Sequence, residues 1–169
     1  EVFRIVGVPM LRNAENGFNT TLFAYGQTGS GKTYTLLGDR NAWTRGDDAT
    51  LGLVPRMCRE LLEKEESTAA SSVKTEISFM EIYNDKVRDL LTLTSSHLKV
   101  REHPRRGVYV EDLSSFAVST YAEVLRLLRR GSLARTTKST RMNTRSSRSH
   151  AIFQIRRIGE STSSTISLV

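Results

Sequence analysis

Cysteine, proline and long apolar runs are all scarce in this chain of 169 residues. The single cysteine, Cys58, excludes an internal disulfide and suits a reducing compartment. No apolar run is long enough to cross a membrane. The first residues, EVFRIVGVPML, have neither an initiator Met nor the basic start of a signal peptide. Because 38% of the residues are hydrophobic, the chain can bury a core, and its length predicts one domain, residues 1–169, with no second domain.

Acidic residues are scarce in one part of the chain. Residues 97–158 hold 14 Lys and Arg against 4 Asp and Glu, whereas residues 1–96 hold 11 against 13. Such an excess indicates a polyanionic partner, which could be nucleic acid, phosphates or an acidic protein surface. A basic face that only meets solvent is the alternative. Aromatic side chains for base stacking are not interleaved with these arginines, which disfavours nucleic acid.

Strand and helix signals alternate along the chain. Alternating and β-branched runs predict strands, and apolar residues at 3.6-residue spacing predict helices. The mixture predicts an α/β fold with a central mixed sheet. The expected helices are 2–14, divided by Pro9; 53–66; a short turn in NDKVRDLL (84–91); and EVLRLLRRG (123–131), begun by the capping box TYAE (120–123). The expected strands are a buried one in TTLFAYG (20–26), 72–83, 150–158 and 164–169, with a hairpin over 98–113. A loop is expected over 38–52, in which Trp43 packs on a neighbouring surface or, as the alternative, lines a ligand site.

A glycine-rich stretch, GQTGSGKT (26–33), matches the phosphate-binding loop pattern in full. Its glycines allow backbone N–H groups to wrap around an anion, and the following helix adds its positive end. Lys32 is expected to reach the β- and γ-phosphates, and Thr33 to offer its hydroxyl to Mg²⁺. A flexible turn is the alternative, but the motif follows a predicted strand and precedes a helix, as it should. The predicted nucleotide contacts are Gly26, Gln27, Thr28, Gly29, Ser30, Gly31, Lys32 and Thr33.

A second stretch, NTRSSRSH (143–150), combines arginines with small hydroxyl and amide side chains. Adjacent serines can offer a hydroxyl to Mg²⁺ and help to place water. An arginine beside them can pair with an acid elsewhere and close the loop only on an intact nucleotide. Ser146, Ser147 and Arg148 have this chemistry. From the residues alone, a phosphorylatable basic loop or a patch that grips nucleic acid stays open.

Taken in chain order, FNTTLFAYGQTGSGKTYT, SFMEIYNDKVRDLL, VREHPRRGVYVEDL and NTRSSRSH resemble the kinesin motor domain over nearly the whole chain. The form HPRRGVYVEDL is most similar to the third kinesin subfamily, the vesicle and organelle transporters. Myosin has a similar cradle and a related loop, but that loop continues with Phe-Gly where this chain has Ser149 and His150. The resemblance implies a P-loop NTPase, a three-layer α/β/α sandwich with a central mixed sheet, truncated at both ends.

The resemblance also implies a function. It indicates an ATP-hydrolysing motor that moves along microtubules in the cytoplasm, with ATP and Mg²⁺ as cofactors and tubulin as partner. Residues 143–150 would be the first switch loop, in which Asn143, Ser146, Ser147 and Arg148 are the catalytic candidates. Ser147 would join Thr33 on Mg²⁺, Ser146 would help to place the attacking water, and Arg148 would pair with a glutamate of the second switch.

The basic hairpin over 99–106 would face acidic tubulin, with Arg101, Arg105 and Arg106 as the expected contacts, and a hairpin tip in solvent is the alternative. Arginines before the switch loop are expected to form a solvated face: Arg126, Arg129, Arg130 and Arg135, with Lys138.

The family's first strand and second switch do not occur in the sequence. We therefore expect these 169 residues to hydrolyse ATP poorly and to expose sheet edges. The alternative function is a non-motile microtubule-binding protein that has a kinesin-like fold and has lost turnover.

Overall fold

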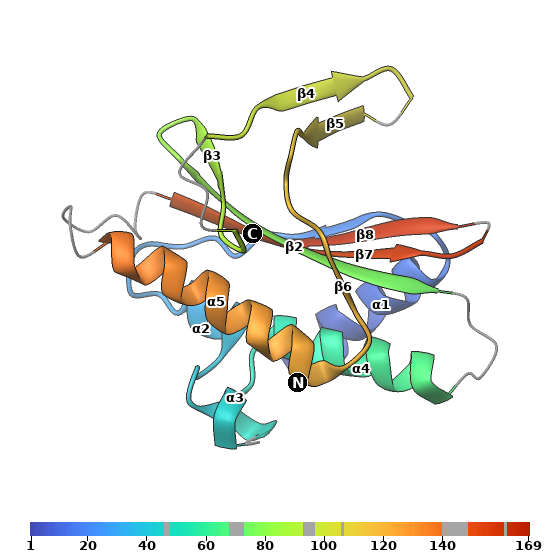
Figure 1. Ribbon diagram of the computed structural model, residues 1–169. Coiled ribbons are helices and arrows are strands. Elements are labelled where there is room, and N and C mark those ends of the chain that lie inside the picture. The colour runs from blue at the N-terminus through green and yellow to red at the C-terminus, as the bar shows by residue number, and fades with distance from the viewer. Residues whose placement is uncertain (46–47, 68–72, 93–96, 106, 140–148, 161) are drawn as a thin grey trace.

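A mixed β-sheet forms the centre of the protein. The computed structural model describes residues 1–45, 48–67, 73–92, 97–105, 107–139, 149–160 and 162–169 (Figure 1). Within these residues the strand order is β1-β8-β7-β2-β3, and β6 pairs with the first half of β2. The pair of β1 and β8 is parallel and the other pairs are antiparallel, as a mixed sheet requires. The strands are β1 (Thr20–Leu22), β2 (Lys74–Tyr83), β3 (Lys86–Asp89), β6 (Phe116–Val118), β7 (Ser149–Ile158) and β8 (Ser163–Leu168).

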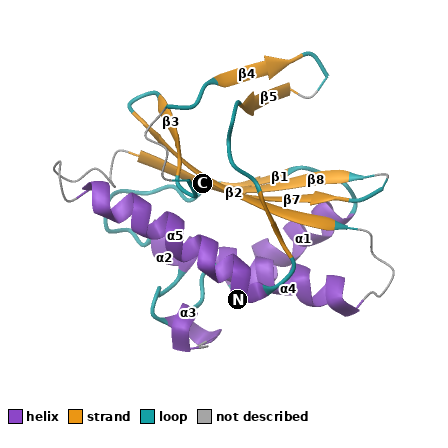
Figure 2. Ribbon diagram, in the orientation of Figure 1, coloured by secondary structure: helices purple, strands orange, loops and turns teal. Residues whose placement is uncertain are grey.

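The helices that pack on this sheet lie on one of its faces (Figure 2). Side chains on that face form the core, where Phe79 and Phe153 meet edge to face with ring centroids 5.4 Å apart. The opposite face is more polar, and there Gln154 donates a hydrogen bond to Ser167. The described residues thus hold the sheet and one helical layer of the expected sandwich. The helices are η1 (Phe3–Gly7), α1 (Val8–Glu15), α2 (Lys32–Leu37), α3 (Ala42–Arg45), η2 (Asp48–Thr50), α4 (Leu53–Ser67) and α5 (Tyr121–Ser139).

Helix boundaries follow the local sequence signals. The first helix changes from a π-helix to an α-helix just before Pro9, which stands in the first turn of α1. At the start of α5, Thr120 Oγ1 accepts a hydrogen bond from the Glu123 N–H, and Glu123 Oε2 accepts those of Ser119 and Thr120. The predicted capping box is therefore confirmed. No helix among the described residues is long and apolar enough to span a bilayer.

Two local predictions were wrong, and the loop expected over 38–52 contains two short helices, α3 and η2. TTLFAYG was expected to be a buried strand, but β1 covers three residues at the edge of the described sheet and leaves Phe23 and Tyr25 exposed. NDKVRDLL was expected to be a helical turn, but Asn84 and Asp85 have φ values of 49° and 58° and form a tight hairpin turn. Since Asn and Asp tolerate this left-handed conformation, the chain reverses there and continues as β3.

The predicted hairpin is confirmed as a separate two-stranded sheet of β4 (Val100–His103) and β5 (Gly107–Val110). It stands beyond the central sheet, on the side opposite the helices (Figure 1). In the 38–52 segment, Trp43 is buried and its indole N–H donates to the Leu37 carbonyl at 3.0 Å. The expectation that Trp43 packs against the body of the protein is therefore confirmed.

Candidate functional site

The glycine-rich loop 26–33 lies between β1 and α2 and includes the first two residues of α2. Three of its glycines have positive φ values, 152° at Gly26, 86° at Gly29 and 90° at Gly31. Residues with a side chain rarely adopt such backbone conformations, so the curve of this loop requires glycine at these positions. At Gly26 there is a second reason, because an added Cβ would collide with the Ser30 side chain.

Lys32 follows the last of these glycines as the first residue of α2. Its ammonium donates hydrogen bonds to the carbonyl oxygens of Gly26 at 2.5 Å and Gln27 at 2.8 Å. The lysine side chain therefore folds back over the loop that precedes it. This contact places one positive charge at the centre of the curve, where an anion held by the loop would also lie.

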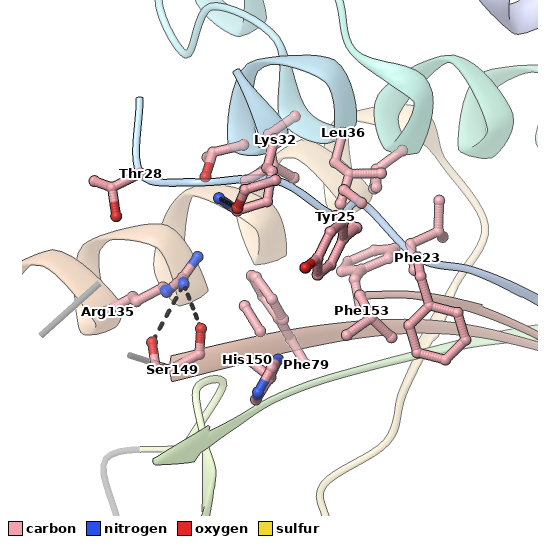
Figure 3. Close-up of a pocket in the computed structure, with 18 of the residues that line it drawn as sticks. Phe23, Tyr25, Thr28, Lys32, Leu36, Phe79, Arg135, Ser149, His150 and Phe153 are labelled. Carbon is pink, nitrogen blue, oxygen red and sulfur yellow. Dashed lines mark hydrogen bonds between the residues drawn. The ribbon is translucent and has the colours of Figure 1, made fainter. Parts of the chain in front are cut away.

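A cavity of about 640 Å³ opens beside this loop. Thr28 and Lys32 lie on one wall, and Ser149 and His150, the first two residues of β7, lie on the facing wall (Figure 3). Gln27 also lines the cavity. These two residues are also the last two of NTRSSRSH. The structure therefore brings the end of the second motif to the phosphate-loop motif. The other lining residues are Phe23, Ala24, Tyr25, Gly26, Thr33, Leu36, Leu37, Val54, Phe79, Arg135, Ala151, Phe153, Leu168 and Val169.

Arg135 is a cavity residue that sequence reasoning placed wrongly on a solvated face. It reaches from α5 to β7, where its Nη2 donates to the hydroxyl of Ser149 at 3.3 Å and to the Ser149 carbonyl at 3.4 Å (Figure 3). Its Nε lies 3.5 Å from Glu81 Oε1. Burial lowers the pKa of Arg135, and the charge of Glu81 opposes that shift.

Glu81 explains why an arginine turns inward at this point. Its side chain is 3% exposed and lies between Arg135 and Arg88, whose Nη2 is 2.7 Å from Glu81 Oε2. A buried carboxylate needs such partners, because an unpaired charge in the interior is costly. The inward positions of β2 are Thr75, Ile77, Phe79 and Glu81, so the alternation already contained the signal of a buried acid.

The other predicted residues divide into described and undescribed ones. Arg101 is exposed and pairs with Glu111 at 3.1 Å, and Arg105 is exposed near the hairpin tip. On α5, Arg126, Arg129 and Arg130 are exposed as expected, and Arg129 also donates to the Trp43 carbonyl at 2.6 Å. The structure does not describe the remaining predicted positions, which are Asn143, Ser146, Ser147, Arg148, Arg106 and the side chain of Lys138.

The strand, glycine-rich loop and helix around Lys32 follow one another in the order that the phosphate-binding loop pattern of an α/β fold requires. Residues 1–168 match the family model described as the kinesin motor domain. The chain therefore belongs to the kinesin motor domain family, as its motifs predicted.

Curated relatives confirm the expected third subfamily. The chain is 47% identical over 161 residues to Kinesin-like protein KIF16B of Mus musculus, an alignment that covers 92% of this chain and 12% of that protein. It is 44% identical over 158 residues to Kinesin-like protein unc-104 of Caenorhabditis elegans, covering 92% and 10%. Identity with human Kinesin-like protein KIF13B is 47% over 158 residues, covering 91% and 8%. The chain thus spans about a tenth of the length of these relatives.

A solved structure confirms the fold. It is described as "Structure of a fast kinesin: Implications for ATPase mechanism and interactions with microtubules". This chain superposes on it with a TM-score of 0.88 and 39% sequence identity, over 99% of this chain and 48% of the other. The mixed sheet with its helices is therefore the kinesin architecture.

Proposed function

We propose that this chain is the nucleotide-binding part of an ATP-driven motor that moves along microtubules in the cytoplasm. The observation that carries the proposal is the shared cavity, in which the loop 26–33 faces the start of β7. A motor needs both parts, a cradle for the phosphates and a segment that responds to the terminal phosphate. The similarity to a solved kinesin that is described with an ATPase mechanism and microtubule interactions supports this assignment.

The described residues fit a nucleoside triphosphate. The positive φ values at Gly26, Gly29 and Gly31 permit N–H groups to turn toward an anion, and the cavity of about 640 Å³ has the size of a ligand site. Lys32 now bonds to two carbonyl oxygens. Because charged acceptors form stronger hydrogen bonds than neutral ones, phosphate oxygens would replace these carbonyls.

Two hydroxyl side chains would hold the metal. Thr33 lines the cavity, and Ser147 belongs to the stretch that ends at its opposite wall. Mg²⁺ bound to ATP supplies charge neutralisation at the phosphates during hydrolysis. Beside them, Ser146 would help to place the attacking water and Arg148 would pair with an acid of the second switch. Arg135 holds Ser149, and so fixes the point where this stretch joins β7.

The β4–β5 hairpin would contact the microtubule. Arg101 and Arg105 are exposed on it, and Arg106 lies between them and β5 in the sequence. Basic side chains on a projecting hairpin suit the acidic surface of tubulin, and their contribution falls as salt screens it. In this proposal the nucleotide cavity and the microtubule-facing hairpin are both connected to the central sheet.

A steady-state ATPase assay with and without microtubules tests the proposal on the full-length protein that contains this chain. We expect stimulated turnover that falls at least about 100-fold in Lys32→Ala, because the cradle loses its charge on the phosphates. Lys86→Ala is the matched control, since Lys86 is an exposed lysine at the start of β3, outside the cavity lining.

Arg148→Ala tests the role of the first switch loop separately from nucleotide binding. Loss of stimulated turnover with retained ATP affinity is expected, since the loop would bind nucleotide without closing. Unchanged turnover in this variant would contradict the salt-bridge role. Microtubule binding by the unmodified protein without any turnover would instead establish the non-motile alternative.

A further inference from the structure

The segment that carries the hairpin leaves the central sheet after β3 and returns to it at β6. Its two ends meet at one buried carboxylate, that of Asp89, which is the last residue of β3. Asp89 Oδ1 accepts hydrogen bonds from the N–H groups of Leu91 at 2.7 Å and Thr92 at 3.2 Å. Asp89 Oδ2 accepts one from the N–H of Ser114, on the returning end, at 2.9 Å. A single side chain therefore joins the departing and returning ends.

Other contacts at the base of the hairpin join its parts in pairs. Leu98 N–H donates to the Val87 carbonyl at 2.9 Å, and Glu111 N–H donates to the Lys99 carbonyl, also at 2.9 Å. On the returning end, the Ser115 hydroxyl donates to Glu76 Oε2 at 2.9 Å near the surface. These bonds stabilise the base, but each of them links only one strand to one neighbour. Asp89 differs because it holds both ends and is only 7% exposed.

The chemistry of this position requires a carboxylate. Three backbone N–H groups converge on Asp89, and an ionised carboxylate accepts hydrogen bonds at both of its oxygens. An asparagine has one acceptor oxygen, so its amide NH₂ would face an N–H donor at one of the two ends. Burial increases the penalty for such an unsatisfied donor. A carboxylate can therefore accept hydrogen bonds from both ends of the segment at once, whereas an asparagine cannot.

We propose that Asp89 is a positioning residue that fixes the direction in which the β4–β5 hairpin projects from the sheet. A hairpin held at its base presents Arg101 and Arg105 in one arrangement, so little conformational freedom is lost when it binds. The inference rests on the proposed function, in which the partner of this basic hairpin is the acidic surface of a microtubule. Asp89 lies at the base and does not itself contact that partner.

Microtubule co-sedimentation of the full-length protein tests this role with Asp89→Asn. We expect the dissociation constant for microtubules to rise about tenfold, because the hairpin must now be ordered on binding. Amide hydrogen exchange at Leu91 and Ser114 should become faster, while exchange at Ile77 and Phe153 in the central sheet stays unchanged. The affinity for a fluorescent ATP analogue should change by less than about twofold, because Asp89 is outside the cavity lining.

Ser115→Ala is a second variant that spares the core, since Ser115 bonds to Glu76 near the surface. It should raise the microtubule dissociation constant about two- to threefold. Glu111→Gln is the matched control, because it removes an acidic partner of Arg101 and leaves the three bonds to Asp89 intact. It should not accelerate exchange at Leu91 or Ser114.

Two outcomes separate this inference from the function on which it rests. If Asp89→Asn and Ser115→Ala both keep the original microtubule affinity, the positioning role is overturned. If the Asp89→Asn protein fails to fold, Ser115→Ala still tests whether fixing the base of the hairpin affects microtubule affinity, and an unchanged affinity in that variant overturns the positioning role. Full microtubule affinity in the double variant Arg101→Ala, Arg105→Ala would overturn the hairpin as the track contact, whatever Asp89 does.

Discussion

The cavity beside the loop 26–33 and the base of the hairpin use related chemistry in different ways. At the base of the hairpin, three N–H groups already bond to an internal anion, the carboxylate of Asp89. In the loop 26–33, positive φ values at three glycines allow N–H groups to turn toward an anion that would come from outside, the phosphates of the proposed ATP. An internal anion stabilises one conformation permanently. An external anion stabilises a conformation only while it is bound, as a switch requires.

A second internal anion supports the cavity wall. Glu81 holds Arg88 and Arg135, and Arg135 holds the start of β7. The cavity thus combines a wall whose charges are paired within the protein with a loop that, in the proposed function, binds an external ligand. This contrast leads to three predictions, in order of decreasing effect.

The largest effect is expected for Glu81→Ala, which leaves buried Arg88 and partly buried Arg135 without their shared acid. Removing one partner of a buried ion pair costs about 3–5 kcal/mol of unfolding free energy. Urea denaturation of this chain measures the loss. Glu76→Ala is the matched control on the same strand, because Glu76 is on the opposite, more polar face. It pairs with exposed Lys74, an interaction expected to contribute about 0–1 kcal/mol, and accepts a hydrogen bond from Ser115 near the surface, so its loss should be clearly smaller. Equal losses in the two variants would contradict the structural role of Glu81.

An intermediate effect is expected for Gly31→Ala in the loop. Gly31 has a φ of 90°, yet a Cβ added there meets nothing within 4 Å, so strain in the backbone is the expected cause. Such strain costs about 1–2 kcal/mol, enough to weaken the binding of a fluorescent ATP analogue about tenfold if the loop shifts to relieve it. Gly159→Ala is the control, since Gly159 is a loop glycine outside the positive-φ region. Nucleotide affinity that is unaffected by Gly31→Ala would show that the loop geometry is not required.

The smallest effect is expected for Glu123→Gln at the start of α5. Like Asp89, Glu123 accepts backbone N–H groups, but it does so at the surface, where water competes. Hydrogen bonds from the N–H groups of Ser119 and Thr120 lower the pKa of Glu123 below its ordinary value of 4.5. Its contribution to stability is therefore present above that value and disappears as the pH falls through the lowered pKa.

Thermal unfolding at pH 7 and pH 3 measures this contribution. Glu123→Gln should melt slightly below the unmodified protein at pH 7, and the gap should narrow at pH 3. A gap that widens in acid would contradict the assignment. A decrease as large as that of Glu81→Ala would contradict the distinction between buried and exposed anions.

Local signals in the sequence were sufficient for much of the fold and for locating the glycine-rich loop that lines the cavity. The capping box at Thr120, the hairpin tip after His103 and the strand that contains Ile77 were predicted because neighbouring residues decide them. The loop with Lys32 was recognised for the same reason, since eight consecutive residues contain its pattern. The functional roles of Ser146, Ser147 and Arg148 stay predictions.

Long-range packing explains the predictions that were wrong. Arg135 was expected in solvent because its neighbours on α5 are basic, but the acid that turns it inward comes from β2. Phe23 was expected to be buried because its run is apolar, but its position at the sheet edge depends on strand order. Asn84 and Asp85 show the opposite case, since their turn signal was present in the sequence and was read as helix.

The sequence by itself determined the family, the phosphate loop around Lys32 and the alternation of helices and strands, because each depends on residues that are close together in the chain. Only the tertiary structure decided that Ser149 faces that loop, that Glu81 lies between two arginines, and that Asp89 joins both ends of the hairpin segment. These contacts link elements that are remote in the sequence. They form because the sheet brings the elements together, and because buried charges and N–H groups must find partners there.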